Sequence, residues 1–172
     1  MTVFSIQQGD ITKLDIDVIV NAANETLLSG GGVDGAIHRA AGKGLLEECR
    51  RLNGCQTGEA KLTRGYNLPA RYIIHTVGPV WQQHPPKEAD RLLLNCYFNS
   101  LRICLKKGLQ SIAFPCISTG IFGFPPQRAA QLVVKNVIEF CKIHPGLAQV
   151  IFCCFDIESK TLYDQAFHEI VS

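Results

Sequence analysis

Six short apolar segments recur along the chain, each bounded by polar, glycine or proline residues. They cover residues 2–7, 18–20, 60–63, 72–77, 111–115 and 149–155. Segments 72–77, 111–115 and 149–155 are almost continuously apolar, which is typical of strands that helices cover on both faces. The pattern therefore predicts six strands, of which at least these three lie in the buried part of a sheet.

Helices are predicted between the strands, where apolar residues recur at steps of three and four. The two clearest sets are Leu93, Tyr97, Leu101 and Cys104, and Ala130, Val133, Val137 and Cys141. The proline pair at 125–126 fits the opening turn of the second of these helices, where a missing N–H does no harm. A last helix is expected over residues 158–170, with Leu162, Ala166 and Phe167 on its inner side.

Strands that alternate with helices indicate an α/β sandwich around a largely parallel sheet. The length of 172 residues suits one buried core, so we expect a single domain over residues 1–172. The proline-rich stretch 83–87 is expected to be a surface loop and not a domain boundary.

The composition limits the kinds of partner that this chain can have. Hydrophobic residues make up 47% and charged residues 19%, a balance typical of a globular domain, and the net charge of +2 gives no sign of a nucleic-acid partner. No apolar run approaches the ~20 residues of a membrane helix, and residues 1–8 do not resemble a signal peptide. We therefore expect a cytoplasmic protein that has neither a membrane nor a nucleic-acid partner.

Eight cysteines raise the question of metal binding or disulfides. They are Cys49, Cys55, Cys96, Cys104, Cys116, Cys141, Cys153 and Cys154. None stands in a Cys-x-x-Cys pair or at zinc-knuckle spacing from a histidine, and most lie in apolar segments, where a thiol packs as a small core residue. Buried, reduced thiols and no metal are the favoured interpretation, while a site assembled from distant cysteines stays open.

The first chemical signal follows the apolar segment that ends at Val20. The residues Asn21-Ala-Ala-Asn24 lead to a glycine-rich loop, Ser29-Gly-Gly-Gly-Val-Asp-Gly35, and then to a short helical pattern that ends near Ala41. Successive glycines let a backbone approach a ligand closely, and the start of a helix adds unpaired N–H groups and a positive dipole end. This combination suits a phosphate group, and a plain flexible loop is the alternative.

A second loop of the same kind follows the strand predicted at 111–115 and reads Cys116-Ile-Ser-Thr-Gly-Ile-Phe-Gly-Phe124. Ligands of open α/β sheets collect beyond the carboxyl ends of the strands, so the two loops can hold a pyrophosphate from two sides. Phe122 stands where a phosphatase loop that starts at Cys116 needs arginine, and Cys116 stands where a nucleophile elbow at Ser118 needs glycine. The G-x-G-x-x-G spacing of the first loop is discounted as a dinucleotide motif, because about ten residues separate it from its strand. The second loop therefore indicates binding and not nucleophilic attack.

Five short motifs resemble those of the macrodomain family, in the order in which macrodomains carry them. They are Gly9-Asp-Ile-Thr12, Asn21-Ala-Ala-Asn24, Gly30-Gly-Gly-Val-Asp-Gly35, His75-Thr-Val-Gly-Pro79 and Ile117-Ser-Thr-Gly-Ile-Phe-Gly123. The Gly-Gly-Val-Asp step and Thr57-Gly-Glu-Ala60 resemble the MacroD-like branch, which includes bacterial O-acetyl-ADP-ribose deacetylases. The resemblance implies a three-layer α/β/α sandwich with a mixed, largely parallel sheet. It also implies that ADP-ribose is the ligand or substrate and that no cofactor is needed.

The resemblance implies which residues contact this ligand. Asp10 and the Ile11 N–H should hold adenine, and Phe155 should pack on the adenine face, with core packing of Phe155 as the alternative. Asn24 should hold the distal ribose, whereas Asn21, also placed on the ligand side, looks more like a brace for the strand end. The phosphates should lie between two sets of residues, Gly31, Gly32 and Val33 in the first loop and Ser118, Thr119, Gly120, Ile121 and Phe122 in the second.

Asp34 distinguishes a catalytic domain from a binding module. Its implied place is beside the distal ribose, where a carboxylate that is ionised at neutral pH can orient or polarise a water. A cap for the following helix is the structural alternative. With Asn24 as the second catalytic residue, the implied activity is metal-free hydrolysis of O-acetyl-ADP-ribose and of mono-ADP-ribose esters on protein Asp or Glu. A non-catalytic reader of ADP-ribosylated proteins and an ADP-ribose phosphate phosphatase stay open.

Two histidines and one cysteine complete the candidates. His38 is expected to make a structural contact, with catalysis as the alternative, and His75 is expected to be a core histidine. Cys116 departs from the family, which commonly has a small residue such as alanine at this place. Its thiol leads to the hypothesis that the second loop is sensitive to oxidation.

Overall fold

The computed structural model describes residues 1–171, so Ser172, the last residue of the expected domain, lies outside the described residues. One sheet contains the strands β1 (Val3–Gln8), β2 (Val18–Ala22), β3 (Ala60–Arg64), β4 (Tyr72–Thr76), β5 (Ser111–Phe114) and β6 (Gln149–Cys154). Each strand overlaps one of the six apolar segments, and the strand predictions are therefore confirmed.

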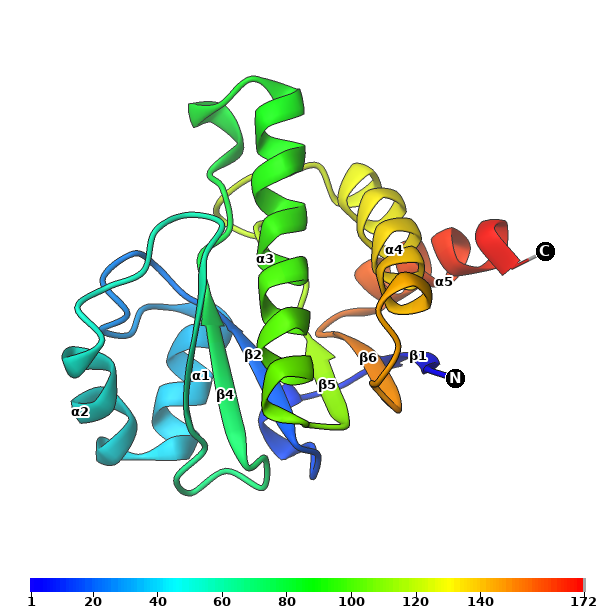
Figure 1. Ribbon diagram of the computed structural model, residues 1–172. Coiled ribbons are helices and arrows are strands. Elements are labelled where there is room, and N and C mark those ends of the chain that lie inside the picture. Colours follow the sequence, from blue (N-terminus) through cyan, green and yellow to red (C-terminus); the bar gives the residue numbers. More distant parts are fainter. Residues whose placement is uncertain (172) are drawn as a thin grey trace.

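Helices and short turns connect the strands (Figure 1). They are η1 (Ile11–Lys13), α1 (Gly32–Ala41), α2 (Lys43–Arg51), η2 (Trp81–Gln83), α3 (Pro86–Lys107), α4 (Pro126–Ile143) and α5 (Ile157–Val171), where η denotes a single 3-10 turn. The helices predicted around 93–104, 130–141 and 158–170 are confirmed, and the proline pair does open α4. None of these helices, within residues 1–171, is long and apolar enough to cross a bilayer.

Two parts of the helix pattern were predicted wrongly. The stretch 83–87 was expected to be a loop, but only residues 84 and 85 connect two helical turns there. Gln83 ends η2, and Pro86 is the first residue of α3, because proline needs no N–H partner in an opening turn. The helix α2 was not predicted at all. Its buried apolar face consists of Leu45 and Cys49 in an otherwise charged segment, which is too sparse a pattern to recognise.

The sheet is mixed and largely parallel. Its strand order is β1-β6-β5-β2-β4-β3, and every neighbouring pair runs parallel except β3 and β4. The five parallel strands β1, β6, β5, β2 and β4 are therefore consecutive, and the segments that follow them leave the sheet at one common edge. This edge is where the chemical signals of the sequence gather.

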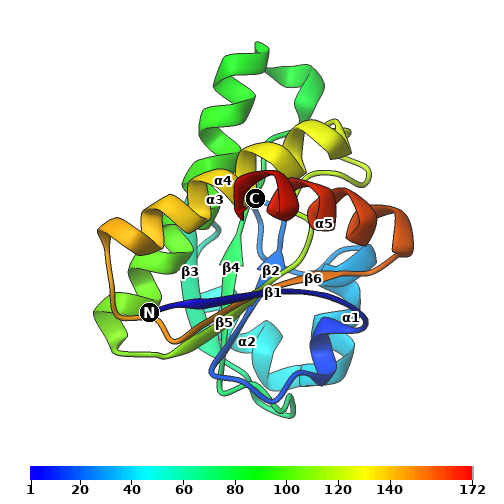
Figure 2. The ribbon, with the colours of Figure 1, turned by 90° about the vertical axis from the view of Figure 1, so that its right-hand side faces the viewer.

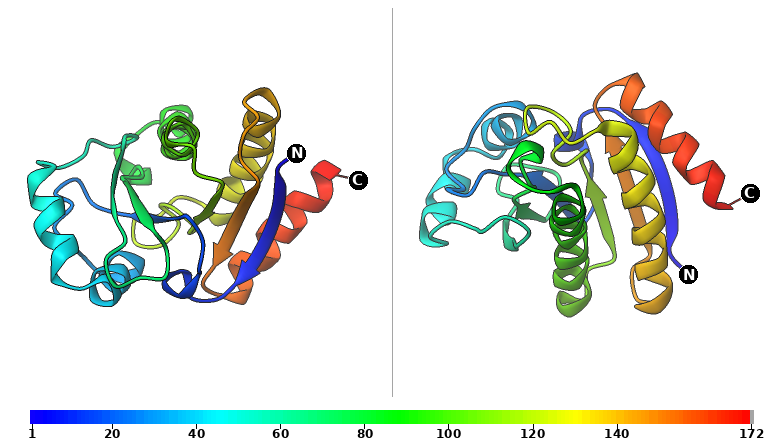
Figure 3. Two further views of the ribbon diagram at one scale, coloured as in Figure 1. Left: turned by 60° about the horizontal axis from the view of Figure 1, so that its bottom comes forward. Right: turned by 90° about the horizontal axis from the view of Figure 1, so that it is seen from above.

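Helices cover the sheet on both faces. Phe114 and Phe152 point toward α3, α4 and α5, whereas Ala113 and Ile151 point toward α1 and α2. Figure 2 shows these two helical layers with the strands between them. At one end of the sheet, β1 and α5 lie side by side (Figure 3). The predicted three-layer α/β/α sandwich is confirmed.

Candidate functional site

A cleft of about 650 Å³ opens at the carboxyl edge of the five consecutive parallel strands. Asp10 follows β1, Phe155 follows β6, and the two glycine-containing loops follow β2 and β5. All of the predicted site residues line this cleft except Asn21. Segments that are up to about 145 residues apart in sequence thus meet because their strands are neighbours in the sheet.

The first loop is more helical than its glycines suggest. Gly31 is the N-cap of α1, and Gly32 adopts a left-handed φ of +56° as the helix begins. The first turn of a helix leaves its N–H groups without partners inside the helix and carries the positive end of the helix dipole. Because Gly31, Gly32 and Val33 line the cleft, this turn offers a site for an anion.

Gly30 lies between the two candidate catalytic side chains. A Cβ at this position would stand 3.1 Å from the Asp34 Oδ2 atom and 3.3 Å from the Asn24 Nδ2 atom. Any side chain here would crowd both groups. Gly30 also lines the cleft, and the sequence-based prediction did not include it among the contact residues.

The second loop is held by its own backbone. The Phe124 N–H donates to the Ser118 carbonyl at 2.9 Å, and the Gly123 N–H donates to the Gly120 carbonyl at 3.0 Å. Within residues 1–171, the N–H groups of 119–122 donate to no backbone acceptor, and the buried Ser118 hydroxyl has no hydrogen-bond partner. The loop therefore presents unsatisfied donors to the cleft, opposite the start of α1.

Asp10 and Phe155 belong to the end of the cleft that is furthest along the sheet from Asp34. The Asp10 Oδ1 atom accepts hydrogen bonds from the Thr12 hydroxyl at 2.7 Å and the Thr12 N–H at 3.0 Å, which lower the pKa of Asp10. Asp10 is therefore an ionised acceptor. Phe155 is 85% exposed, so its alternative role as a core residue is wrong, and its ring is available to a flat ligand group.

Asp34 is a buried carboxylate at the cleft wall. Its Oδ1 atom accepts a hydrogen bond from the Asn21 amide at 2.8 Å and lies 3.4 Å from the His38 Nε2 atom. Burial raises the pKa of Asp34, and the Asn21 bond and nearby His38 oppose this rise. Burial likewise lowers the pKa of His38. Asp34 is thus a stronger base than an exposed aspartate, and His38 makes the structural contact expected of it.

Asn21 lies behind the cleft wall. Its side chain is fully buried, and its Nδ2 atom contacts both Asp34 and, at 3.1 Å, the Nδ1 atom of His75. Its place among the ligand-contacting residues was therefore wrong, and its alternative role as a brace fits the structure. His75 is a core histidine, as expected: burial lowers its pKa to about 3, so the ring is neutral.

The hydrogen bonds around His75 fix its tautomer. The Asn21 amide nitrogen only donates, so the His75 Nδ1 atom accepts. The proton of the neutral ring is therefore on Nε2, which lies 2.9 Å from the Thr63 hydroxyl, and that hydroxyl in turn donates to the Arg64 carbonyl. This chain of bonds orients the Asn21 side-chain amide, so that one of its N–H groups donates to His75 and the other donates to Asp34.

Some cleft residues were not found from the sequence. Arg39, an exposed residue of α1, lines the cleft near Asp34, and Gly78 packs so closely that a Cβ there would stand 2.0 Å from the Ser118 Oγ atom. Asp156 and Ser159 line the cleft at the start of α5. Gly78 falls inside a recognised motif and was detectable, whereas the others stand in segments without any local signal.

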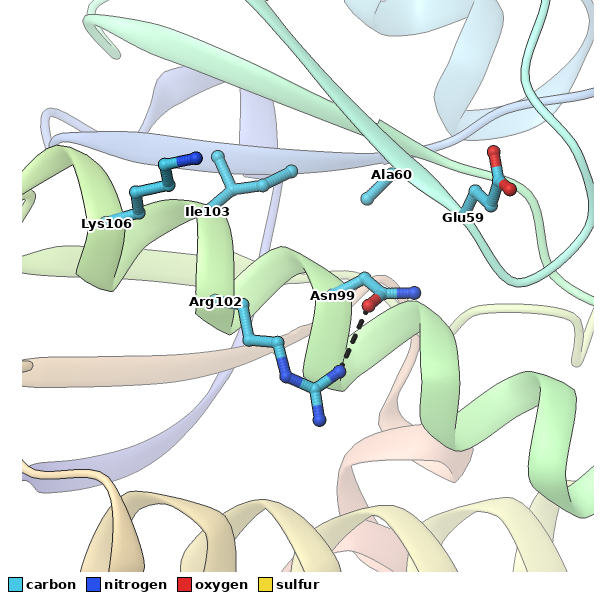
Figure 4. Close-up of a pocket in the computed structure, with 6 residues that line it drawn as sticks. All are labelled: Glu59, Ala60, Asn99, Arg102, Ile103 and Lys106. Atoms are coloured by element: carbon cyan, nitrogen blue, oxygen red, sulfur yellow. Dashed lines mark hydrogen bonds between the residues drawn. The ribbon is translucent and has the colours of Figure 1, made fainter.

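The remaining candidate groups lie elsewhere in the structure. All eight cysteines are free thiols, and each is buried except Cys116, which is partly exposed. No group of three or more His, Cys, Asp or Glu side chains in the described part of the chain could hold a metal ion. A second hollow, of about 390 Å³, lies between β3 and α3, where Arg102 donates to Asn99 and Lys106 borders the opening (Figure 4). Glu59 and Ala60 of the Thr57-Gly-Glu-Ala60 segment line this hollow, but none of the residues predicted to contact a ligand or to act in catalysis does, so the cleft at the strand ends is the candidate site.

Comparison with known proteins identifies the family. Residues 20–133 match the Macro domain family, and these residues contain both loops of the cleft. The chain belongs to the Macro domain family. The resemblance that its sequence motifs carry is thereby confirmed.

Three relatives illustrate how closely this macrodomain matches. A macro domain-containing protein of Ralstonia nicotianae is 56% identical over 162 residues, which cover 94% of this chain and 92% of that protein. The human ADP-ribose glycohydrolase MACROD2 is 50% identical over 98% of this chain, which spans 40% of the human protein. A solved structure of an Oceanobacillus iheyensis macrodomain variant with ADPR has a TM-score of 0.94 and 40% identity, over 99% of this chain and 94% of that one.

Proposed function

We propose that this macrodomain binds ADP-ribose and hydrolyses esters that join an acyl group to its distal ribose. The observation that carries the proposal is the buried Asp34 carboxylate, held by Asn21 at the wall of a cleft whose two loops present free N–H donors. The relatives support it, because MACROD2 is named an ADP-ribose glycohydrolase and the Oceanobacillus iheyensis variant was solved with ADPR.

The cleft suits the parts of ADP-ribose in order along its length. Adenine would lie between the exposed Phe155 ring and the ionised Asp10, which can accept a hydrogen bond from an exocyclic amine. The pyrophosphate would lie between the start of α1 and the second loop, where donors come from the backbone. The distal ribose would then reach Asn24 and Asp34.

The chemistry proposed for Asp34 is activation of a water. Its carboxylate accepts a hydrogen bond from the water and takes up a proton as the water oxygen bonds to the ester carbon. The ester bond breaks, the ribose hydroxyl receives a proton, and the products are ADP-ribose and a carboxylic acid. Because burial raises the pKa of Asp34, this carboxylate is a better base than an exposed one. We propose O-acetyl-ADP-ribose and proteins mono-ADP-ribosylated on Asp or Glu as substrates, with no cofactor or metal.

One experiment tests both binding and chemistry. Purified wild-type protein, Asp34→Ala and Asn24→Ala are followed over time with O-acetyl-ADP-ribose and with a transferase automodified on acidic residues, while calorimetry measures ADP-ribose binding. Loss of a general base lowers rates by about 10²- to 10⁴-fold, and we expect this for Asp34→Ala with much of the binding retained. Asp15→Ala is the matched control, because Asp15 is exposed and lies outside the cleft. Unchanged turnover in both cleft variants would refute the catalytic roles, and binding without any turnover in the wild type would instead indicate a reader.

A further inference from the structure

Two cysteines come together at the base of the second loop: Cys116, which is its first residue, and Cys154, which is the last residue of β6. β5 and β6 run parallel, and Phe114 is in register with Phe152. Cys116 and Cys154 each stand two residues beyond this pair, and both side chains pack on the same side of the sheet, toward α3, α4 and α5. Adjacent strands lie about 4.8 Å apart, inside the Cα–Cα range of about 4.4–6.8 Å that a disulfide spans. The backbone therefore places the two thiols where they can form a bond.

The surroundings of Cys116 favour a thiolate. The Cys154 thiol and, from α5, the hydroxyls of Ser159 and Tyr163 lie near the Cys116 sulfur, with their proton-donating groups available to a negative charge there. These contacts, led by that of Cys154, lower the pKa of Cys116 although burial opposes them. The proximity of Cys116 raises the pKa of Cys154, which therefore keeps its proton.

Cys116 differs in two ways from the other seven cysteines, all of which lie in the described residues. It is partly exposed, whereas the others, including Cys153 which also lines the cleft, are buried. Each of the others has a raised pKa, for which burial is the main cause in every case except Cys154. The thiolate is the form of cysteine that reacts with oxidants, so reactivity concentrates at Cys116.

We propose that Cys116 is an oxidation site and that Cys154 is its resolving partner. A hydroperoxide reacts with the Cys116 thiolate: the O–O bond breaks, a sulfur–oxygen bond forms, and water or an alcohol leaves. The Cys154 sulfur then attacks the resulting sulfenic acid, a sulfur–sulfur bond forms, and the hydroxyl leaves as water with the Cys154 proton. The two thiols lose two electrons in total, and the peroxide gains them.

The disulfide changes the cleft, and this part of the inference rests on the proposed function. An S–S bond of about 2.05 Å is shorter than any contact between unbonded sulfurs, so the Cys116 and Cys154 side chains must move closer together. The Thr119 hydroxyl is bonded to the Cys116 carbonyl at 3.2 Å, which transmits the movement to the second loop. Phe155, the proposed adenine contact, directly follows Cys154. We expect oxidised protein to bind ADP-ribose about tenfold more weakly, and by linkage ADP-ribose disfavours the disulfide by the same factor.

The test uses the full chain treated with hydrogen peroxide, followed by non-reducing peptide mapping. Trypsin releases Cys116 alone in peptide 108–128, and releases Cys154 together with Cys153 in peptide 143–160. We expect a linked peptide pair in the wild type that dithiothreitol reverses. Cys153→Ala is the matched control, because Cys153 points to the other face of the sheet and the linked pair should persist. Cys154→Ala should leave Cys116 as a trappable sulfenic acid, and Cys116→Ala should abolish the linkage.

The outcomes separate this inference from the proposed function. Failure to link Cys116 with Cys154 in folded wild-type protein, or linkage of Cys116 with Cys153, would overturn the oxidation site whatever the ligand. A linked protein that binds ADP-ribose as well as the reduced protein would overturn the effect on the cleft. Reduced protein that binds no ADP-ribose would count against the proposed function alone, because the peptide map still decides whether the thiol pair forms.

Discussion

Removal of the Asn21 amide should move the pH range in which Asp34 can act. The Asn21 Nδ2 atom donates to the ionised Asp34 carboxylate at 2.8 Å, in a place where neither residue is more than 4% exposed. A hydrogen bond to a charged group contributes about 1.5–3 kcal/mol, and 1.36 kcal/mol corresponds to one pH unit. The bond lowers the pKa of Asp34, so Asn21→Ala should raise it and shift the acid limb of the pH–rate profile upward by about one to two pH units.

The sign follows from the proposed chemistry. Asp34 must be ionised to accept a proton from water, so the rate falls as the pH drops through the pKa of Asp34, and a higher pKa moves this fall toward neutral pH. The assay is the rate of ADP-ribose release between pH 4 and 8 for wild type and Asn21→Ala. Thr63→Val is the control, because it removes the acceptor at the far side of His75 and leaves the Asn21–Asp34 bond in place. An acid limb that stays fixed in a folded Asn21→Ala protein would refute the reasoning.

Three further predictions concern the loops, the ligand and the core. Gly35→Ala places a Cβ 2.5 Å from the Gly30 carbonyl oxygen, so urea unfolding should show a loss of about 1–3 kcal/mol, and an unchanged midpoint would contradict this packing. Phe155→Ala should weaken ADP-ribose binding, measured by calorimetry, by about 1–3 kcal/mol. Its Tm should not change, because the ring is 85% exposed, and an unchanged affinity would show that Phe155 does not contact the ligand. Burial lowers the pKa of His75 from 6.5 to about 3, so the unfolded chain binds more protons between these values. The free energy of unfolding should therefore fall as the pH drops below about 6.5, by up to about 1.4 kcal/mol per pH unit. Urea unfolding at several pH values should show a smaller fall per pH unit in His75→Gln than in the wild type.

The strands were predictable because a buried strand requires apolar residues close together in the sequence, and this pattern is visible without the structure. β5 and β6 are apolar at almost every position. A short run of consecutive apolar residues is typical of a strand that is covered on both faces. The helix α2 was not predictable, because two buried side chains in a charged segment give no clear period. The proline pair at 85–86 is equally compatible with a loop and with an opening helical turn, and the choice depends on where the chain packs.

The candidate site was predictable as a set of segments but not as a set of contacts. Each segment follows a recognisable strand and carries glycine or polar residues, which is a local property. The burial of Asn21 behind Asp34 depends on His75 from another strand, and no local pattern encodes that. The approach of Cys116 to Cys154 likewise depends on β5 and β6 being neighbours in register, although each cysteine alone resembles ordinary core.

The polar groups buried behind the cleft argue that this region serves chemistry and not stability. The Asp34 carboxylate is desolvated by burial, and the Asn21 Oδ1 atom has no hydrogen-bond partner within the described residues. The buried His75 is neutral, whereas in the unfolded chain it would hold a proton below about pH 6.5. Each of these features costs folding free energy, and apolar side chains of similar size would avoid the cost. Their shared result is one carboxylate held in one orientation, with a raised pKa, at the wall of the cleft. Unfavourable burial that converges on a single reactive group is the pattern expected of a catalytic base.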